Sequence, residues 1–218
     1  MNSTELIETF REEMNDTQRP HLWSDTLLFR YLNEAQELFC RRTEGIEDSS
    51  TPSVCRVAVV ADTDWYPISE KILKVREAVD VATGYTIDLM NMEKASLKGV
   101  RFDGRPGPLK LFVTGLEKHK LRAWPMPGRP AAVELRVFRL PLVQITDDGD
   151  QPLEIDEQHH LALLLWVKHK AYGKEDAETF DRRKSDEYES RFYAYCATAI
   201  KEQGRARRNA GTVMYGGV

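Results

Sequence analysis

The stretch SDTLLFRYLNEAQELFCRR, residues 24–42, decides how the chain begins to fold. Apolar side chains return in it every three or four residues, the spacing that places them on one face of an α-helix. Ser24 is a favourable N-cap, two arginines suit the last turn, and Gly45 follows as a terminator. Because ELIETF upstream has the same spacing, residues 4–44 are predicted to form two helices.

The period changes to two across residues 52–145, where apolar and polar residues alternate in short runs. Strings rich in glycine and proline, such as RPGP at 105–108 and PMPGRP at 125–130, separate these runs. This pattern is typical of an antiparallel β-sandwich or small barrel. One predicted strand carries four apolar residues on a single face: Leu73, Val75, Val79 and Val81.

The helical period returns in EIDEQHHLALLLWVKHKAY (154–172) and continues after Gly173, following an acidic connector at 144–158. The apolar run 161–167 is predicted to lie deep in a helical bundle. The resulting fold class is α+β, a bundle of N- and C-terminal helices with an inserted antiparallel β domain. The predicted parts are 1–48 (helices), 49–145 (β domain), 146–203 (helices) and 204–218 (a flexible tail).

The composition is that of an ordinary globular protein, with 218 residues, 41% hydrophobic and 30% charged. The formal net charge of −4 gives the whole chain no basic footprint of the kind that sequence-independent DNA binders carry. No apolar run reaches the roughly 18 residues of a membrane span, and the N-terminus is unlike a signal peptide. We read Cys40, Cys55 and Cys196 as reduced thiols of a soluble intracellular chain, with a lone reactive cysteine as the alternative.

The sequence contains no recognisable catalytic or metal-binding motif. His159, His160 and His169 share one predicted helix but not one face, so we expect solvated or helix-end histidines and no metal. Paired carboxylates lie in connectors or on a mixed-charge face, where nothing indicates the burial that acid–base catalysis needs. We therefore expect no enzyme and no cofactor. DGRPGP (103–108) is read as a hairpin loop, or alternatively as a partner-binding loop.

Two further segments leave alternatives open. Trp65 and Tyr66 either pack against the sheet or form a subunit contact. The basic cluster Arg205, Arg207 and Arg208 belongs to a solvated mobile end, docks on an acidic protein surface, or contacts the DNA backbone.

The order of these parts resembles the head-to-tail adaptor proteins of tailed phages, especially the tail tubular protein A type. The resemblance rests on LWSDTLLFRYLNEAQELFCRRTEGIED (22–48), TPSVCRVAVVADTDWYPIS (51–69), the returning helix at 154–195, and the tail NAGTVMYGGV (209–218). It covers most of the chain, although residues 90–130 match little. Its specificity comes from the order and co-occurrence of the parts, because the individual motifs are not chemically diagnostic.

The resemblance implies a virion protein of the neck, made in the host cytoplasm, whose closed ring of about twelve copies lies below the portal protein. The ring would extend the channel through which DNA passes without sequence-specific or membrane contacts, and tail nozzle or tail tube proteins would dock on it. Related adaptors insert their C-terminal segment along the portal. Here that segment gives these candidate portal-binding residues: Arg205, Arg207, Arg208, Val213, Met214, Tyr215, Gly216 and Gly217. The alternative is another phage tail-completion module, or a carbohydrate-binding or partner-binding module.

Overall fold

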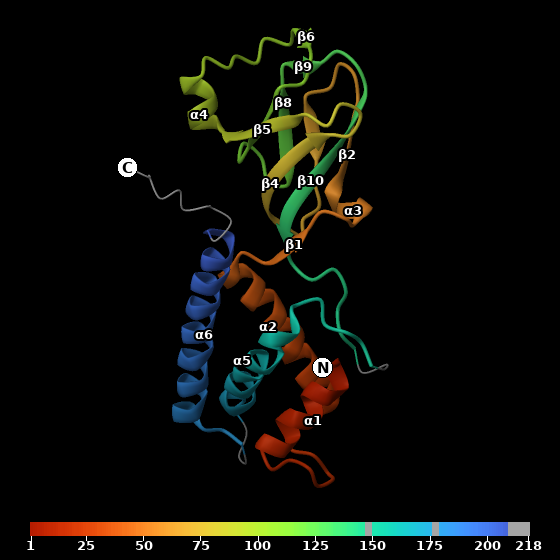
Figure 1. Ribbon diagram of the computed structural model, residues 1–218. Helices are drawn as coiled ribbons and strands as arrows, with labels where there is room; N and C mark the ends of the chain where they lie inside the picture. The colour runs from red at the N-terminus through yellow and green to blue at the C-terminus, as the bar shows by residue number, and fades with distance from the viewer. Residues whose placement is uncertain (147–149, 176–178, 209–218) are drawn as a thin grey trace, which may run out of the picture. The chain divides into compact units, whose positions relative to one another are not determined.

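The computed structural model describes residues 1–146, 150–175 and 179–208, except for the side chains of 206–208. It divides the chain into two compact units (Figure 1). The helical unit comprises Met1–Glu44 and Pro141–Val218, and the β unit comprises Gly45–Leu140. The predicted α+β class is thus confirmed, with mostly helices in one unit and mostly strands in the other.

Four long helices and one short 3-10 helix form the helical unit: α1 (Ser3–Glu13), α2 (Asp25–Thr43), η1 (Glu157–His159), α5 (His160–Gly173) and α6 (Arg182–Arg208). Helix α5 contacts α1, α2 and α6, and Figure 1 shows it between α2 and α6. Its apolar run provides much of this core, since Leu163, Leu164 and Val167 are at most 1% exposed. Leu161 is an exception to the prediction, because it is 56% exposed at the start of the helix.

The helix ends follow from local chemistry. At the start of α1, the Asn2 side chain accepts a hydrogen bond from the Glu5 backbone N–H, and the Glu5 carboxylate accepts one from the Asn2 backbone N–H. This reciprocal pair satisfies two amides that would otherwise lack partners. At the end of α2, Glu44 adopts a left-handed conformation and Gly45 follows with φ of 88°, so the chain leaves the helix at the predicted place.

Helix α6 begins later than the sequence pattern predicts. The pattern indicated a helix directly after Gly173, whereas α6 starts at Arg182. The Asp181 side chain accepts a hydrogen bond from the Lys184 backbone N–H at 3.0 Å, which is the role of an N-cap. Phe180 precedes that cap and is 47% exposed. The capping residue Asp181 therefore sets the start of α6, and the periodic spacing of apolar residues before it does not.

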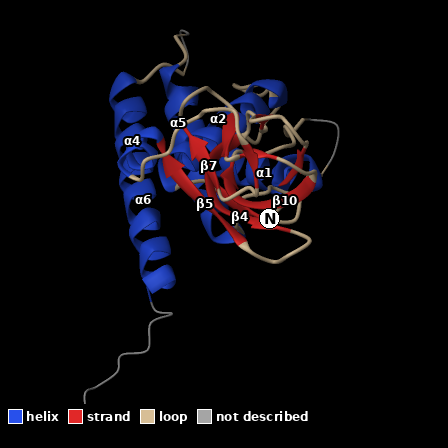
Figure 2. Ribbon diagram, turned by 90° about the horizontal axis from the view of Figure 1, so that it is seen from above, coloured by secondary structure: helices blue, strands red, loops and turns tan. Residues whose placement is uncertain are grey.

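The β unit contains ten strands and two short helices: β1 (Ile46–Asp48), α3 (Pro52–Cys55), β2 (Arg56–Val59), β3 (Trp65–Pro67), β4 (Ile72–Asp80), β5 (Thr86–Asn91), α4 (Met92–Leu97), β6 (Pro106–Gly107), β7 (Leu111–Thr114), β8 (Lys120–Trp124), β9 (Met126–Pro127) and β10 (Ala131–Arg139). Eight of them form one curled sheet in the order β1-β10-β4-β5-β7-β8-β3, with β2 also paired to β10. Figure 2 shows the strands of this sheet in red, including β4, β5, β7 and β10.

The sheet is not wholly antiparallel, which corrects the predicted topology. Strands β5 and β7 pair in parallel, from Asp88 opposite Leu111 to Asn91 opposite Thr114. Parallel neighbours need a crossover between them, and α4 supplies it. Its N-cap is Asn91, whose side chain accepts from the Lys94 backbone N–H, so the helix starts directly where β5 ends.

The long pair of β4 and β10 contains two register shifts, between Arg136 and Val137 and between Phe138 and Arg139. Each irregularity moves the following side chains to the other face of the strand. Ala78 is fully buried, whereas Val81, which was predicted to share a face with Leu73, Val75 and Val79, lies beyond the end of β4 and is 48% exposed. The simple alternation read from the sequence is therefore interrupted at each bulge.

The β unit has a core on each face of the strands β7 and β8. Phe112 is fully buried and meets Tyr66 edge to face, with ring centroids 6.0 Å apart. The neighbours of Phe112 in β7 belong to a second cluster beneath α4 that contains Met90, Ala95, Val100, Leu111 and Val113. Because successive side chains of a strand point to opposite faces, the three apolar residues that begin β7 serve both cores.

Candidate assembly surfaces

The basic cluster predicted for the tail begins inside a helix. Helix α6 continues through Gly204 to Arg208, which places the backbone of Arg205, Arg207 and Arg208 in its last turns instead of in a flexible segment. A single glycine costs a helix only about 1 kcal/mol relative to alanine, and arginines near the C-terminus favour the helix dipole. The Arg205 side chain is exposed. The side chains of Arg207 and Arg208, and all of Val213, Met214, Tyr215, Gly216 and Gly217, lie outside the described residues.

The buried face of α6 is fixed to α2 and α5 by aromatic contacts. Phe192 is fully buried, with its ring centroid 5.4 Å from that of Trp166. Nearer the C-terminus, the Tyr195 hydroxyl lies 2.9 Å from His159 Nδ1, and both rings contact Phe39. Burial lowers the pKa of His159 and raises the pKa of Tyr195, so both groups favour their neutral forms. Helix α6 therefore has a rigid base from which its basic end extends.

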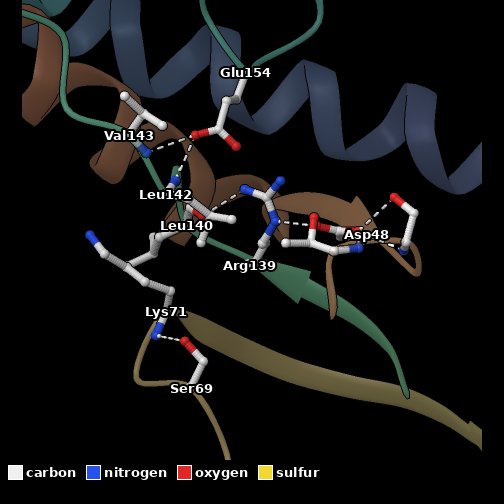
Figure 3. A network of polar contacts seen from close by, with 10 residues as sticks. Asp48, Ser69, Lys71, Arg139, Leu140, Leu142, Val143 and Glu154 are labelled. Carbon is white, nitrogen blue, oxygen red and sulfur yellow. Dashed lines mark hydrogen bonds and ion pairs between the residues drawn. The ribbon is translucent and has the colours of Figure 1, made fainter. Parts of the chain in front are cut away.

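A buried ion pair joins the first and last strands of the β unit (Figure 3). Arg139 Nε lies 2.6 Å from Asp48 Oδ2, and both side chains are less than a tenth exposed. Asp48 also accepts hydrogen bonds from the Thr51 hydroxyl at 2.7 Å and from the backbone N–H groups of Ser50 and Thr51. Burial alone would raise the pKa of Asp48, but these donors outweigh it and hold the pKa well below its usual range.

The Asp48 carboxylate also affects the pKa of the neighbouring Cys55 thiol. Burial raises the pKa of Cys55 to about 11, and the negative charge of Asp48 adds to the effect. All three cysteines are buried and free of disulfides. A thiol with such a pKa is protonated and unreactive at neutral pH, which favours the reading of Cys55 as a core residue.

In the helical unit, side chains hold the connector that follows Pro141. Glu154 Oε1 accepts hydrogen bonds from the backbone N–H groups of Leu142 at 2.6 Å and Val143 at 3.0 Å (Figure 3). The Asn33 amide of α2 makes two hydrogen bonds with the Ile145 backbone, at 2.7 Å and 2.9 Å. These bonds satisfy backbone groups that lie outside regular structure. The start of the acidic connector is thus held to α2 by hydrogen bonds.

The β unit carries a groove, here called the basic groove, between the start of β4 and the hairpin that joins β7 to β8. Its volume is about 520 Å³. Its apolar side chains include Ile68, Ile72, Leu73, Val75 and Leu121, and its rim carries Lys74, Lys118, His119 and Lys120. Glu117 is the only acidic residue among those that line the groove, and its carboxylate lies 2.7 Å from Lys120 Nζ. The charge of the rim is therefore positive.

Trp65 packs within the β unit, as one of the two readings of its sequence predicts. The Arg122 guanidinium lies 5.0 Å from the centroid of the Trp65 ring and 3.8 Å from that of Phe102. Arg122 Nε also lies 2.9 Å from Asp64. The guanidinium is thus enclosed between two aromatic faces and one carboxylate, an arrangement that fixes the loop carrying Phe102 over β8.

DGRPGP does not form a hairpin. Pro106 and Gly107 make up β6, which pairs in parallel with Met126 and Pro127 of β9. Each of the two strands contains a proline, Pro106 in β6 and Pro127 in β9, and a proline has no backbone N–H to donate, so only a short ladder can form. The loop is therefore part of a small second sheet.

The three histidines His159, His160 and His169 each have a different structural partner. His159 and His160 lie at the start of α5 as predicted for helix ends, but both are only 4% exposed and not solvated. His160 Nε2 lies 2.7 Å from the Ile155 carbonyl oxygen, and His169 Nδ1 lies 3.0 Å from the Ser185 hydroxyl. Among the described residues no group of three His, Cys, Asp or Glu side chains could hold a metal ion. No helix within the same residues is long and apolar enough to cross a membrane.

Comparison with known proteins places the chain in one protein family. A search of the curated proteins found no significant match to the chain. The family model described as SU10 adaptor protein matches residues 1–215, which is almost the whole chain. A family defined as phage adaptors implies a structural component of the virion that acts through contacts with other head and tail proteins. The chain belongs to the SU10 adaptor protein family.

Proposed function

We propose that this protein is the head-to-tail adaptor of a tailed phage, of the tail tubular protein A type. It forms a closed ring of about twelve copies below the portal, extends the DNA channel, and offers a docking surface to tail nozzle or tail tube proteins. Its role is structural and involves no reaction. The observation that carries the proposal is the match of the SU10 adaptor family over residues 1–215.

The end of α6 supports the assignment of the portal contact. Its last turns are basic, and residues 209–218 contain no charged side chain, three glycines, and Met214 and Tyr215 as large apolar groups. A segment of this composition can gain its order from a partner, which lets it cover a large surface on a symmetric ring. We infer that Arg205, Arg207 and Arg208 dock on acidic portal residues while Val213–Gly217 follow the portal wall. Many such weak contacts act together through effective concentration.

The proposal predicts that deletion of Gly211–Val218 abolishes portal binding without unfolding the chain. The adaptor is expected to be mainly monomeric alone and to form a ring when purified portal protein is added, as measured by light scattering or mass photometry. The triple substitution R205E/R207E/R208E should weaken the same complex by about tenfold or more, since each buried or partly buried charge pair contributes of order 1 kcal/mol.

The control is Lys94→Glu, which changes an exposed lysine of α4 and should leave portal binding unchanged. Wild-type protein that joins no portal at any concentration would contradict the adaptor function itself. Normal portal binding by the truncated protein would instead contradict only the role of the C-terminal segment.

The alternative of a carbohydrate-binding module gains less support. Such modules present free aromatic faces to sugar rings, whereas Arg122 covers Trp65 and Phe102 within the β unit. Retention of the protein on glycan arrays would favour the alternative over the adaptor.

A further inference from the structure

Opposite charges gather in the two units of the chain. The β unit contains 15 Lys and Arg against 12 Asp and Glu, a formal charge of +3. The remaining residues contain 16 Lys and Arg against 23 Asp and Glu, a formal charge of −7. The net charge of −4 for the whole chain hides this division. Each copy of the protein therefore carries both members of an electrostatically complementary pair.

The basic groove is one place where the positive charge of the β unit gathers. Lys118 is exposed on its rim and makes no ion pair with the residues that the structure describes. Lys120 adds a second exposed cation, shared with Glu117. The backbone turns sharply here, with His119 at φ of 55°, so these two lysines sit on a tight hairpin and not on a long loop. The hairpin thus presents its cations in a defined place.

The negative member is the outer face of α1. Glu5, Glu8 and Glu12 are all exposed and are spaced three and four residues apart, which places them on one side of the helix. Within the described chain, Glu8 and Glu12 have no cationic partner, whereas Glu13 on the next face pairs with Lys168. The opposite side of α1 is anchored by Leu6 and Phe10, which are fully buried. The acidic face is therefore rigid and free to meet another molecule.

We propose that the acidic face of α1 in one copy docks on the basic groove of a second copy. The inference rests on the proposed ring and names the contact that closes it. Identical subunits that each carry both surfaces make a head-to-tail contact, and such contacts generate rings when the rotation closes. Complementary charges steer the encounter and fix its register, although each exposed pair adds little affinity alone. The contact accordingly weakens as salt screens it over a Debye length of about 10 Å at 0.1 M.

A second copy fits the groove better than a nucleic acid does. The groove offers three lysines, of which Lys74 and Lys120 already interact with other residues of the chain, and its interior is largely apolar. A DNA phosphate backbone selects long runs of uncompensated cations. The acidic helix is also present on every neighbour at the high local concentration that assembly on the portal creates. DNA binding remains a distinct outcome of the experiment.

Cysteine cross-linking tests the contact in the full-length chain. Glu8→Cys is introduced in one batch of protein and Lys118→Cys in a second batch with a different tag, and the three native cysteines are all buried. Mixed on portal and oxidised, the two batches should form a heterodimer, and a chain carrying both cysteines should form a ladder of oligomers. The matched control replaces Glu8→Cys with Thr198→Cys on the exposed face of α6, and it should form neither. If no disulfide forms between two copies, and any that forms lies within a single chain, the proposal is overturned.

A charge swap provides the second measurement. The pair K118E/K120E should weaken association between copies by about tenfold at low salt, and adding E8K/E12K should restore it. Unchanged ring formation by K118E/K120E on portal would overturn this contact and leave the adaptor function standing. Loss of duplex DNA binding with normal ring formation would assign the groove to DNA instead. Failure of the wild-type protein to join portal would remove the ring and this contact together.

Discussion

At the scale of single residues, the pair Asp48–Arg139 is a deeply buried ion pair of the β unit. The two side chains come from residues 91 positions apart and meet at 2.6 Å with little exposure. Asp48 lies in β1 and Arg139 in β10, so the pair joins the two ends of this unit. Removing one partner of a buried ion pair is strongly destabilising, because the remaining charge stays buried without a counter-charge. That cost is much larger than the net stability that the intact pair contributes.

Asp48→Asn should lower the free energy of unfolding by about 3–5 kcal/mol, because it leaves the buried Arg139 guanidinium without its counter-charge. Urea unfolding followed by circular dichroism measures the change. Asp103→Asn is the matched control, since its partner Arg105 is 87% exposed and the substitution should have little effect. Equal loss of stability in both variants would show that the pair at Asp48 has no special weight.

The same carboxylate should shape the response to acid. The pKa of Asp48 is lower in the folded chain than the value of about 3.9 in unfolded peptides. Its contribution to stability is therefore complete above about pH 5 and is lost progressively as the pH falls below about 4. The stability of the wild-type protein should fall more steeply between pH 5 and pH 3 than that of Asp48→Asn. Parallel pH profiles of the two proteins would contradict this origin of the acid sensitivity.

At the scale of elements, periodicity predicted the helices better than the strands. The spacing of apolar residues located α1, α2 and α5 closely, because a helix is formed by contacts within a few residues. It misplaced the start of α6, where Asp181 caps the helix, and its end, where the helix runs through Gly204. The sheet was harder, since bulges and the parallel pair β5–β7 depend on distant partners.

Two glycines test these element boundaries with opposite signs. A Cβ added at Gly204 meets nothing within 4 Å, so Gly204→Ala should stabilise the end of α6 by about 0.5–1 kcal/mol. At Gly45, with φ of 88°, the added Cβ would lie 2.6 Å from the Arg139 carbonyl oxygen, so Gly45→Ala should destabilise the chain by more than about 1 kcal/mol. Amide hydrogen exchange of residues 200–208 and thermal unfolding measure the two effects. Reduced protection in Gly204→Ala would contradict a helical α6 end.

At the scale of the whole molecule, the chain consists of two compact units with separate cores. The helical unit is built around α5, with Leu163 fully buried, and the β unit around its curled sheet, with Leu135 only 1% exposed. The chain enters and leaves the β unit once, at Gly45 and Leu140. Each unit thus has the apolar burial that an independent cooperative transition requires.

Thermal unfolding should accordingly show two transitions that core substitutions shift separately. Leu163→Ala and Leu135→Ala each remove a buried leucine and should each cost about 2–5 kcal/mol in the unit that contains them. Calorimetry of the full-length protein reads both transitions in one scan. A single transition that both substitutions lower equally would show that the units unfold as one.

The sequence alone determined the approximate positions of α1, α2 and α5, the extended character of much of residues 52–145, the α+β class, and the resemblance to phage adaptors that the SU10 family match supports at the level of the family. It did not predict the short helices α3 and α4 within the β unit. These features follow from local periodicity, capping residues and the order of the parts along the chain. Only the tertiary structure decided the parallel pairing of β5 and β7, the ion pair of Asp48 and Arg139, and the basic groove. Each of these depends on residues distant in sequence, whose meeting is set by packing and strand register and leaves no local pattern to read.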